Sequence, residues 1–135
     1  MLKRKKGQSS TEFILVLGAV FLISLGALIM IQKQVADSKK QKTYVKTGEL
    51  GNLILAEVQN AKASQGFYSR KFFIPETINE NEYLLMHNNS EITIKVEDLE
   101  YILFLEHNVS GKIRKGWNVI EKQGTSTNYT ISVNN

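Results

Sequence analysis

The chain has no cysteine among its 135 residues, and it has one proline and one tryptophan. The absence of cysteine excludes disulfide bonds and thiolate metal sites. An exported domain without disulfides must be held together by packing, by glycans or by assembly. The single proline is Pro75, so nothing before it breaks a helix by removing a backbone donor.

Charge is missing from Phe13 to Ile31, where every residue is uncharged. A run of this length matches the roughly 20 apolar residues that a helix needs to cross a bilayer. Four consecutive cations, Lys3 to Lys6, precede it. The positive-inside bias keeps them on the cytoplasmic side, so we expect the residues after Ile31 to lie outside the cytoplasm.

A general secretory signal peptide is a poor match to this segment. Its apolar region spans about 7–15 residues and ends at a small-x-small cleavage site. Here the run is longer and continues into Gln32 without such a site. If the chain is cleaved, the local chemistry favours a position before the run, where Gly7 gives a flexible peptide bond.

The residues between the basic leader and the apolar run resemble those of a known protein family. The basic leader is followed by Gly7, by Gln8-Ser9-Ser10-Thr11-Glu12-Phe13 and by the apolar run. This arrangement resembles the class III signal peptide of type IV pilins, and the Gln-x-Ser-x-Glu-Phe form is most similar to the archaeal pilins. Many bacterial pilins have a proline that kinks the membrane helix. Its absence here favours a continuous helix.

The resemblance implies that a prepilin peptidase removes residues 1–7 by cutting between Gly7 and Gln8. It implies roles for Lys5, Lys6, Glu12 and Phe13 in processing and assembly. The protein would first be a single-pass protein of the cytoplasmic membrane. A membrane assembly platform and its ATPase would then build a homo-oligomeric helical filament on the cell surface, with the apolar helices as its core and surface adhesion as its role.

The position of Glu12 can also be interpreted without reference to the family. An acid at the centre of a membrane helix costs about 2.5–3.5 kcal/mol on insertion scales, and less near the interface. Such a residue usually has a partner, and the resemblance implies the new N-terminal amine on Gln8 of a neighbouring subunit. The alternative is an acid that favours the helix macrodipole, with Ser9, Ser10 or Thr11 as the cap.

The net charge of +4 does not indicate nucleic-acid binding. The leader holds four of the 17 basic residues, and the remainder balances the 13 acidic ones. The basic excess is therefore a signal of membrane topology, and we expect no nucleic-acid partner.

The periodicity predicts one long helix from about Ser10 to about Ser64, followed by a stop at Gly66. Gly48 and Gly51 leave open an interruption, a bend or a tight contact. The last part is amphipathic. Its predicted apolar face contains Leu50, Leu53, Ile54, Val58 and Ala61, and its polar side contains Glu57, Gln59, Asn60 and Lys62.

From Phe67 onward the period is that of strands. The predicted strands are 67–74, 83–87, 91–96, 101–106, 117–122 and 129–133, with loops or turns at 76–82, 88–90, 108–111 and 124–128. Strict alternation places Ile92, Ile94 and Val96 in the interior. Short strands joined by short turns predict an antiparallel sheet. The sequence thus predicts an α+β fold with a leader at 1–7, a helix at 8–65 that includes the membrane segment 13–31, and a β head at 66–135.

The chain lacks the motifs of an enzyme. It has no nucleophile-elbow serine and no phosphate-binding glycine loop. His87 and His107 are a weak metal signal and are better explained as surface turn residues. We expect no catalytic activity, no metal and no cofactor.

Three N-glycosylation sequons stand out instead, at Asn88, Asn108 and Asn128. Each falls in a predicted turn or at a strand start, where an oligosaccharide has room.

Three other functions remain open beside the structural filament subunit. One is a binding module or minor pilin on the same leader, with Trp117, Tyr101 and Tyr129 as aromatic candidates that core packing explains more simply. Another is a single-pass anchored protein that never assembles. The third is an archaellin, which has a similar leader.

Overall fold

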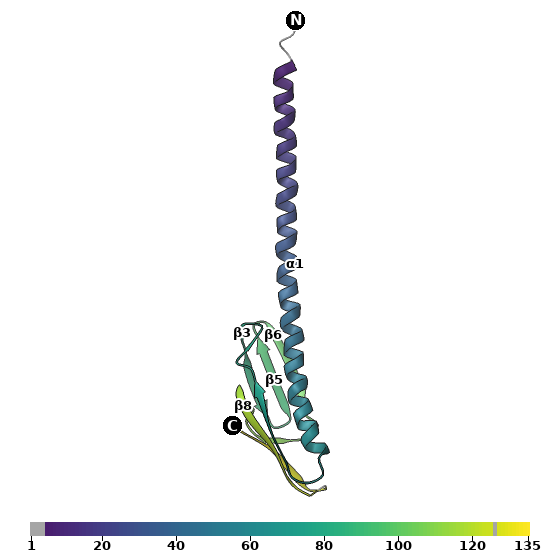
Figure 1. Ribbon diagram of the computed structural model, residues 1–135, viewed down its shortest axis with the longest axis vertical. Helices are drawn as coiled ribbons and strands as arrows, with labels where there is room; N and C mark the ends of the chain where they lie inside the picture. The colour runs from purple at the N-terminus through teal and green to yellow at the C-terminus, as the bar shows by residue number, and fades with distance from the viewer. Residues whose placement is uncertain (1–4, 126) are drawn as a thin grey trace. The chain divides into compact units, whose positions relative to one another are not determined.

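The computed structural model describes residues 5–125 and 127–135, with side chains from Ser10 onward. Residues 1–4 of the predicted leader lie outside the described residues. The chain divides into two compact units, one up to Lys40 and one from Gln41 to Asn135. The α+β fold is confirmed: one long helix is followed by a series of short strands (Figure 1).

The helix α1 spans Lys5–Ala63 without interruption, so it begins earlier than the predicted Ser10 and passes straight through Gly48. A glycine in a helix costs only about 1 kcal/mol relative to alanine, which the favourable residues around Gly48 and Gly51 offset. The end of α1 is as predicted. The amide of Ser64 donates to the carbonyl of Asn60 at 3.1 Å, and Gly66 has a φ of 103° that suits the chain reversal.

The last part of α1 buries one stripe of residues against the strands. This stripe consists of Thr43, Thr47, Leu50, Ile54, Glu57, Val58 and Ala61. Two predictions about this face are wrong. Leu53 is 40% exposed, whereas Glu57 is only 8% exposed. The stripe is centred on Ile54, which puts position 57 on its inner side and position 53 at its rim.

A four-stranded sheet has the order β1-β8-β9-β7, formed by β1 (Tyr68–Ile74), β8 (Gly116–Gly124), β9 (Tyr129–Asn134) and β7 (Val109–Gly111). Its pairs are antiparallel except for β7 and β9, which are parallel. The interpretation of residues 108–111 as a turn is therefore wrong. Val109 is fully buried opposite Ile131, and its burial makes this short segment a strand.

A three-stranded antiparallel sheet consists of β4 (Leu84–Asn88), β5 (Glu91–Val96) and β6 (Leu99–Phe104). The inward orientation of Ile92, Ile94 and Val96 is confirmed, since all three are fully buried. The segment predicted as the loop 76–82 contains a small hairpin instead, β2 (Thr77–Ile78) and β3 (Asn81–Glu82). Asn79 and Glu80 have φ angles of 51° and 69°, as a tight two-residue hairpin turn requires.

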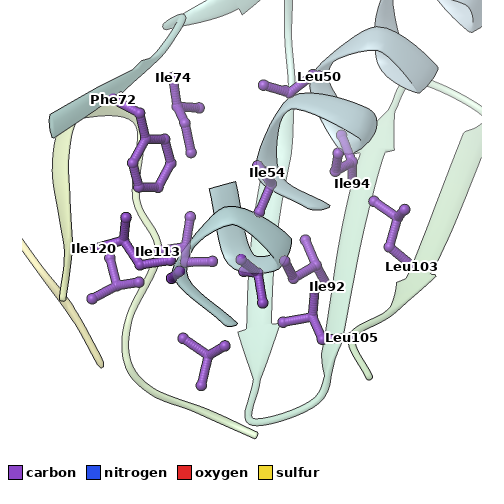
Figure 2. Packing of buried hydrophobic residues seen from close by; sticks show 14 of the residues in the cluster. Leu50, Ile54, Phe72, Ile74, Ile92, Ile94, Leu103, Leu105, Ile113 and Ile120 are labelled. Atoms are coloured by element: carbon purple, nitrogen blue, oxygen red, sulfur yellow. The ribbon is translucent and has the colours of Figure 1, made fainter. Parts of the chain in front are cut away.

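One hydrophobic core joins the end of α1 to both sheets. Figure 2 shows Ile54 of α1 between Phe72 and Ile74 of β1 on one side and Ile92 and Ile94 of β5 on the other. A Cβ placed on Gly51 would come within 2.6 Å of Leu103 Cδ1 and 2.9 Å of Tyr101 Cε1. The tight contact that was one expectation for this glycine is confirmed, with β6 as the partner.

Candidate functional site: the apolar helix and the head surface

The N-terminal half of α1 is a helix long and apolar enough to cross a membrane. Its large apolar side chains between Phe13 and Ile31 are 41–75% exposed, all around the helix. Within the described part of the chain, nothing lies within 4 Å of a Cβ built on Gly18 or Gly26. Such a surface is not stable in water, so lipid or other apolar helices must cover it.

The candidate processing residues lie in the first turns of α1. The backbone of Lys5, Lys6, Gly7 and Gln8 is helical, so the candidate scissile bond is inside the helix rather than in a flexible link. The side chains of these four residues lie outside the described set.

Glu12 and Phe13 lie one turn further along and are both exposed. Among the side chains described, from Ser10 onward with Ser126 excepted, no cation forms an ion pair with Glu12. Glu12 directly precedes the uncharged segment and is the single acidic residue of the sequence before Asp37. In a membrane, a carboxylate at this position needs a partner that offsets the cost of its charge.

The three sequon asparagines are all exposed, and they gather at one end of the head. Asn88 ends β4, and the next residue, Asn89, accepts a 2.9 Å hydrogen bond from the amide of Val109, which follows Asn108. Asn128 directly precedes β9, the parallel partner of β7. The register therefore brings together three sites that are far apart in the sequence.

The aromatic candidates do not form one patch. Trp117 is 67% exposed, so the expectation that it packs in the core is wrong. It faces Phe73 across the β1–β8 pair, with ring centroids 5.2 Å apart. Tyr101 and Tyr129 pack against the core instead, where Tyr129 stacks on His107 at 4.8 Å.

A second exposed apolar surface was not predicted from the sequence. The outward side of the β4–β5–β6 sheet bears Leu84, Met86, Ile102 and Phe104, which are 63%, 52%, 49% and 72% exposed. The apolar residues that recur at every second position of β4 and β6 could have indicated this surface. This pattern was obscured because the inward positions of the same strands are apolar too.

Buried and paired polar side chains hold parts of the head together. Asn118 is fully buried and holds the loop before β8. Its Oδ1 accepts from the amide of Arg114 at 3.0 Å, and its Nδ2 donates to the carbonyl of Arg114 at 2.7 Å.

Lys62 and Glu106 form a 2.7 Å ion pair on the surface, and the hydrogen bond from Lys62 lowers the pKa of Glu106. His87 and His107 are half-buried, and the described residues contain no group of three or more potential metal ligands.

A groove of about 320 Å³ lies between α1 and the β2–β3 hairpin. Its lining mixes apolar and charged groups: Lys46, Glu49, Leu50, Leu53, Pro75, Thr77, Ile78 and Asn79. Comparison with family models, curated proteins and solved structures gives no match to this chain.

Proposed function

We propose that this protein is a structural subunit of an extracellular type IV pilus-like filament. It assembles through its apolar N-terminal helix after cleavage between Gly7 and Gln8, and the filament serves surface adhesion. The observation that carries the proposal is the exposed, uncharged surface from Phe13 to Ile31, bordered by Glu12 and continuous in one helix with a folded head.

The need for assembly follows from the two environments that can cover the apolar helix, the bilayer and neighbouring helices. Before assembly, the bilayer covers the apolar surface, and the cations of the leader hold the N-terminus in the cytoplasm. A filament removes the subunit from lipid, so neighbouring helices must replace the lipid contacts. Burial stabilises by about 25 cal/mol per Å² of apolar surface, and the small residues Gly18 and Gly26 permit close approach.

Glu12 gives this packing its register. Cleavage before Gln8 creates an amine four residues ahead of Glu12, about 6 Å away along the helix axis, so Glu12 of one copy meets the amine of a neighbour that is displaced by this distance. An amine–carboxylate pair between neighbouring subunits removes the cost of two isolated charges, whereas any other register leaves both unpaired. The peptidase, the membrane assembly platform and its ATPase are the partners of this pathway, and the mature protein is a homopolymer on the cell surface.

A single-pass anchored head that acts as a binding module, or as a minor pilin, is the second candidate. The exposed Phe73–Trp117 pair favours it, because aromatic side chains exposed on a rigid sheet are common in recognition surfaces. This candidate does not account for Glu12 at the border of the apolar segment.

The deciding experiment is the mass-spectrometric N-terminus of the protein from membranes and from sheared surface material. The proposal expects a chain that starts at Gln8 in the sheared fraction. A chain that starts at Met1 and is confined to membranes would replace the filament with the anchored head.

Glu12→Ala tests the assembly step by itself. We expect the variant to be processed and inserted but to yield few filaments. Asp37→Ala removes the same charge from α1 outside the apolar segment and should assemble normally, which makes it the matched control. Normal filament yield from Glu12→Ala would remove the role assigned to this carboxylate.

A further inference from the structure

Two of the three sequons differ in how much of each the folded head encloses. In the sequon at Asn108, the asparagine is exposed, but the middle residue Val109 is fully buried. The amide of Val109 donates to the carbonyl of Asn89 at 2.9 Å, and the hydroxyl of Ser110 donates to the carbonyl of Ile131 at 3.2 Å. The side chain of Asn108 is thus accessible, whereas the two residues that complete its sequon are held in the fold.

The sequon at Asn128 is held less tightly. Asn128 and Thr130 are exposed, and Tyr129 is half-buried. Within the described part of the chain, no hydrogen bond uses the hydroxyl of Thr130. Tyr129 and Thr130 pair with β8, but β7 pairs only with residues 131–133 of β9, so the described strands flank this sequon on one side only. It lies at the end of the β8–β9 hairpin, where strands open most easily.

N-glycosylation requires more than an accessible asparagine. The hydroxyl at the third position defines the sequon together with the asparagine, so the transferase must contact both. Three consecutive residues must therefore leave the fold and bind the enzyme together. For Asn108 this means removing Val109 from the core and breaking the hydrogen bond from Ser110 to Ile131. For Asn128 it means opening the last two pairs of the β8–β9 hairpin.

The place of β9 in the chain decides when the Asn108 sequon closes. β7 is parallel to β9, with Val109 opposite Ile131 and Gly111 opposite Val133. β9 follows β7 in the chain and is separated from it by the whole of β8. Before β9 pairs, the hydroxyl of the sequon has no acceptor at Ile131, and Val109 is not covered from that side. The sequon is therefore open in the unfolded chain and closed in the folded head.

We propose that Asn108 is glycosylated only before β9 pairs with β7, whereas Asn128 remains a substrate in the folded head. The donor is a lipid-linked oligosaccharide. The side-chain amide nitrogen loses a proton to the solvent and bonds to the anomeric carbon, while the bond from that carbon to the lipid phosphate breaks and the phosphate leaves with the electron pair. This inference rests on the proposed function for one point, the location of the head outside the cytoplasm. A chain that folds first keeps a bare Asn108.

The purified full-length chain, produced without glycans in a host that lacks the transferase, tests this order. The folded chain in detergent is incubated with an oligosaccharyltransferase and a lipid-linked oligosaccharide, and peptide mass spectrometry follows each site. We expect modification at Asn108 to be at least about tenfold slower than at Asn128, because one valine side chain must leave the core. Equal rates at the two sites of the folded chain would overturn the proposal.

Tryptic peptides of the same protein show how each sequon reacts without the fold. The peptide 96–112 carries Asn108, and the peptide 123–135 carries Asn128. We expect the transferase to modify both peptides at similar rates. If the peptide 96–112 is as slow as Asn108 in the folded chain, the fold is not the cause and the proposal is wrong. A folded chain that stays bare at Asn128 while its peptide is modified would refute the open state of that sequon.

Gly111→Ala should open the Asn108 sequon in an otherwise folded head. Gly111 has a φ of 91°, and a Cβ at this position would collide with the carbonyl oxygen of Val133. Alanine should therefore displace β7 from β9 and raise the rate at Asn108 by about tenfold, toward that of the peptide. Gly124→Ala is the matched control. Gly124 has a φ of 126°, but its Cβ would collide with the carbonyl oxygen of Asn128, so the rate at Asn108 should stay low.

Hydrogen exchange of the Val109 amide shows whether β7 has opened, and circular dichroism shows whether each variant is folded. The Val109 amide should exchange faster in Gly111→Ala than in Gly124→Ala. Fast exchange at Val109 without faster modification at Asn108 would contradict the proposal. If Gly111→Ala does not fold, the comparison of the folded wild-type chain with its peptides decides alone.

The two proposals fail in different ways, because the transfer reaction uses the purified chain and needs no filament. A wild-type N-terminus that contradicts the filament leaves the comparison of rates unaffected. Equal rates at Asn108 and Asn128 in the folded chain remove this inference and leave the filament proposal unaffected.

Discussion

Lys122 Nζ donates a 2.6 Å hydrogen bond to the carbonyl oxygen of Ser64, just beyond the end of α1. A second bond of 3.0 Å goes to the carbonyl of Lys62, and the ammonium lies 4.2 Å from the centre of the Tyr129 ring. Lys122 lies within β8 and is only 1% exposed. A cation at the carbonyl end of a helix also interacts favourably with the macrodipole. The hydrogen bonds of Lys122 therefore connect the four-stranded sheet to the end of α1.

Replacement of Lys122 by methionine should destabilise the head by about 2–4 kcal/mol, since the carbonyls of Lys62 and Ser64 lose their charged donor. Urea unfolding followed by Trp117 fluorescence measures the loss. Lys95→Met is the control, because Lys95 is exposed on β5, and its effect should stay within about 0.5 kcal/mol. Equal effects of the two substitutions would show that the buried contacts contribute nothing.

Gly51 and Gly48 provide a matched pair on α1. Alanine improves helix propensity at either position by about 1 kcal/mol. At Gly51 the new methyl group meets Leu103 at 2.6 Å, whereas at Gly48 nothing lies within 4 Å. Overpacking costs about 1–3 kcal/mol, so Gly51→Ala should be less stable than Gly48→Ala by that amount. Thermal unfolding of the two variants checks this, and equal stability would contradict the close approach to β6.

The main architecture was predictable because its signals are local. The uncharged run predicted an apolar helix long enough to cross a membrane, the 3.6-residue period predicted the end of α1, and strict alternation predicted the inward side of β5. These patterns depend on neighbouring residues of the chain and need no knowledge of the tertiary fold.

The errors arise where a distant segment decides the outcome. Val109 is a strand residue because Ile131 pairs with it, and Glu57 is buried because both sheets close on that side of α1. Trp117 is exposed because its register opposite Phe73 turns it outward. The buried Lys122 had no sequence signal at all, since its acceptors are backbone carbonyls some 58–60 residues away.

Tyr83 should make the head sensitive to alkaline pH. Burial, with the nearby charge of Glu76, raises the pKa of Tyr83 to about 12. Between about pH 10 and pH 12 the unfolded chain loses the phenol proton while the native head keeps it, so stability falls as the pH rises. We expect a loss of about 1–2 kcal/mol over this range.

Urea unfolding across that range measures the slope, and Tyr83→Phe should flatten it. The substitution also removes the hydrogen bond from Tyr83 to the carbonyl of Pro75, so its stability at neutral pH will be lower. The change in slope with pH is therefore the informative quantity. An unchanged slope would assign the alkaline loss to other groups.

Asn118 should be essential to the loop before β8. Alanine at this position leaves the amide and carbonyl of Arg114 and the carbonyl of Gly116 without their buried partner. The expected cost is about 2–4 kcal/mol, because three part-buried hydrogen bonds are lost together. Asn134→Ala on β9 is the exposed control, and hydrogen exchange of the Arg114 amide locates the effect. Unchanged exchange in Asn118→Ala would contradict the assigned hydrogen bonds.

If the sequons are used, the glycans should stand together at the end of the head where α1 ends. Ser90→Ala destroys the sequon of the exposed Asn88, whereas Ser90→Thr preserves it. The backbone carbonyl of Ser90, which accepts from the amide of Leu105, is present in both variants. Intact-mass measurement of the surface protein should therefore fall by one glycan in Ser90→Ala and remain at the wild-type glycan content in Ser90→Thr. A wild-type mass equal to that of the bare polypeptide would exclude glycosylation, and it would leave packing and assembly to stabilise a head that has no disulfides.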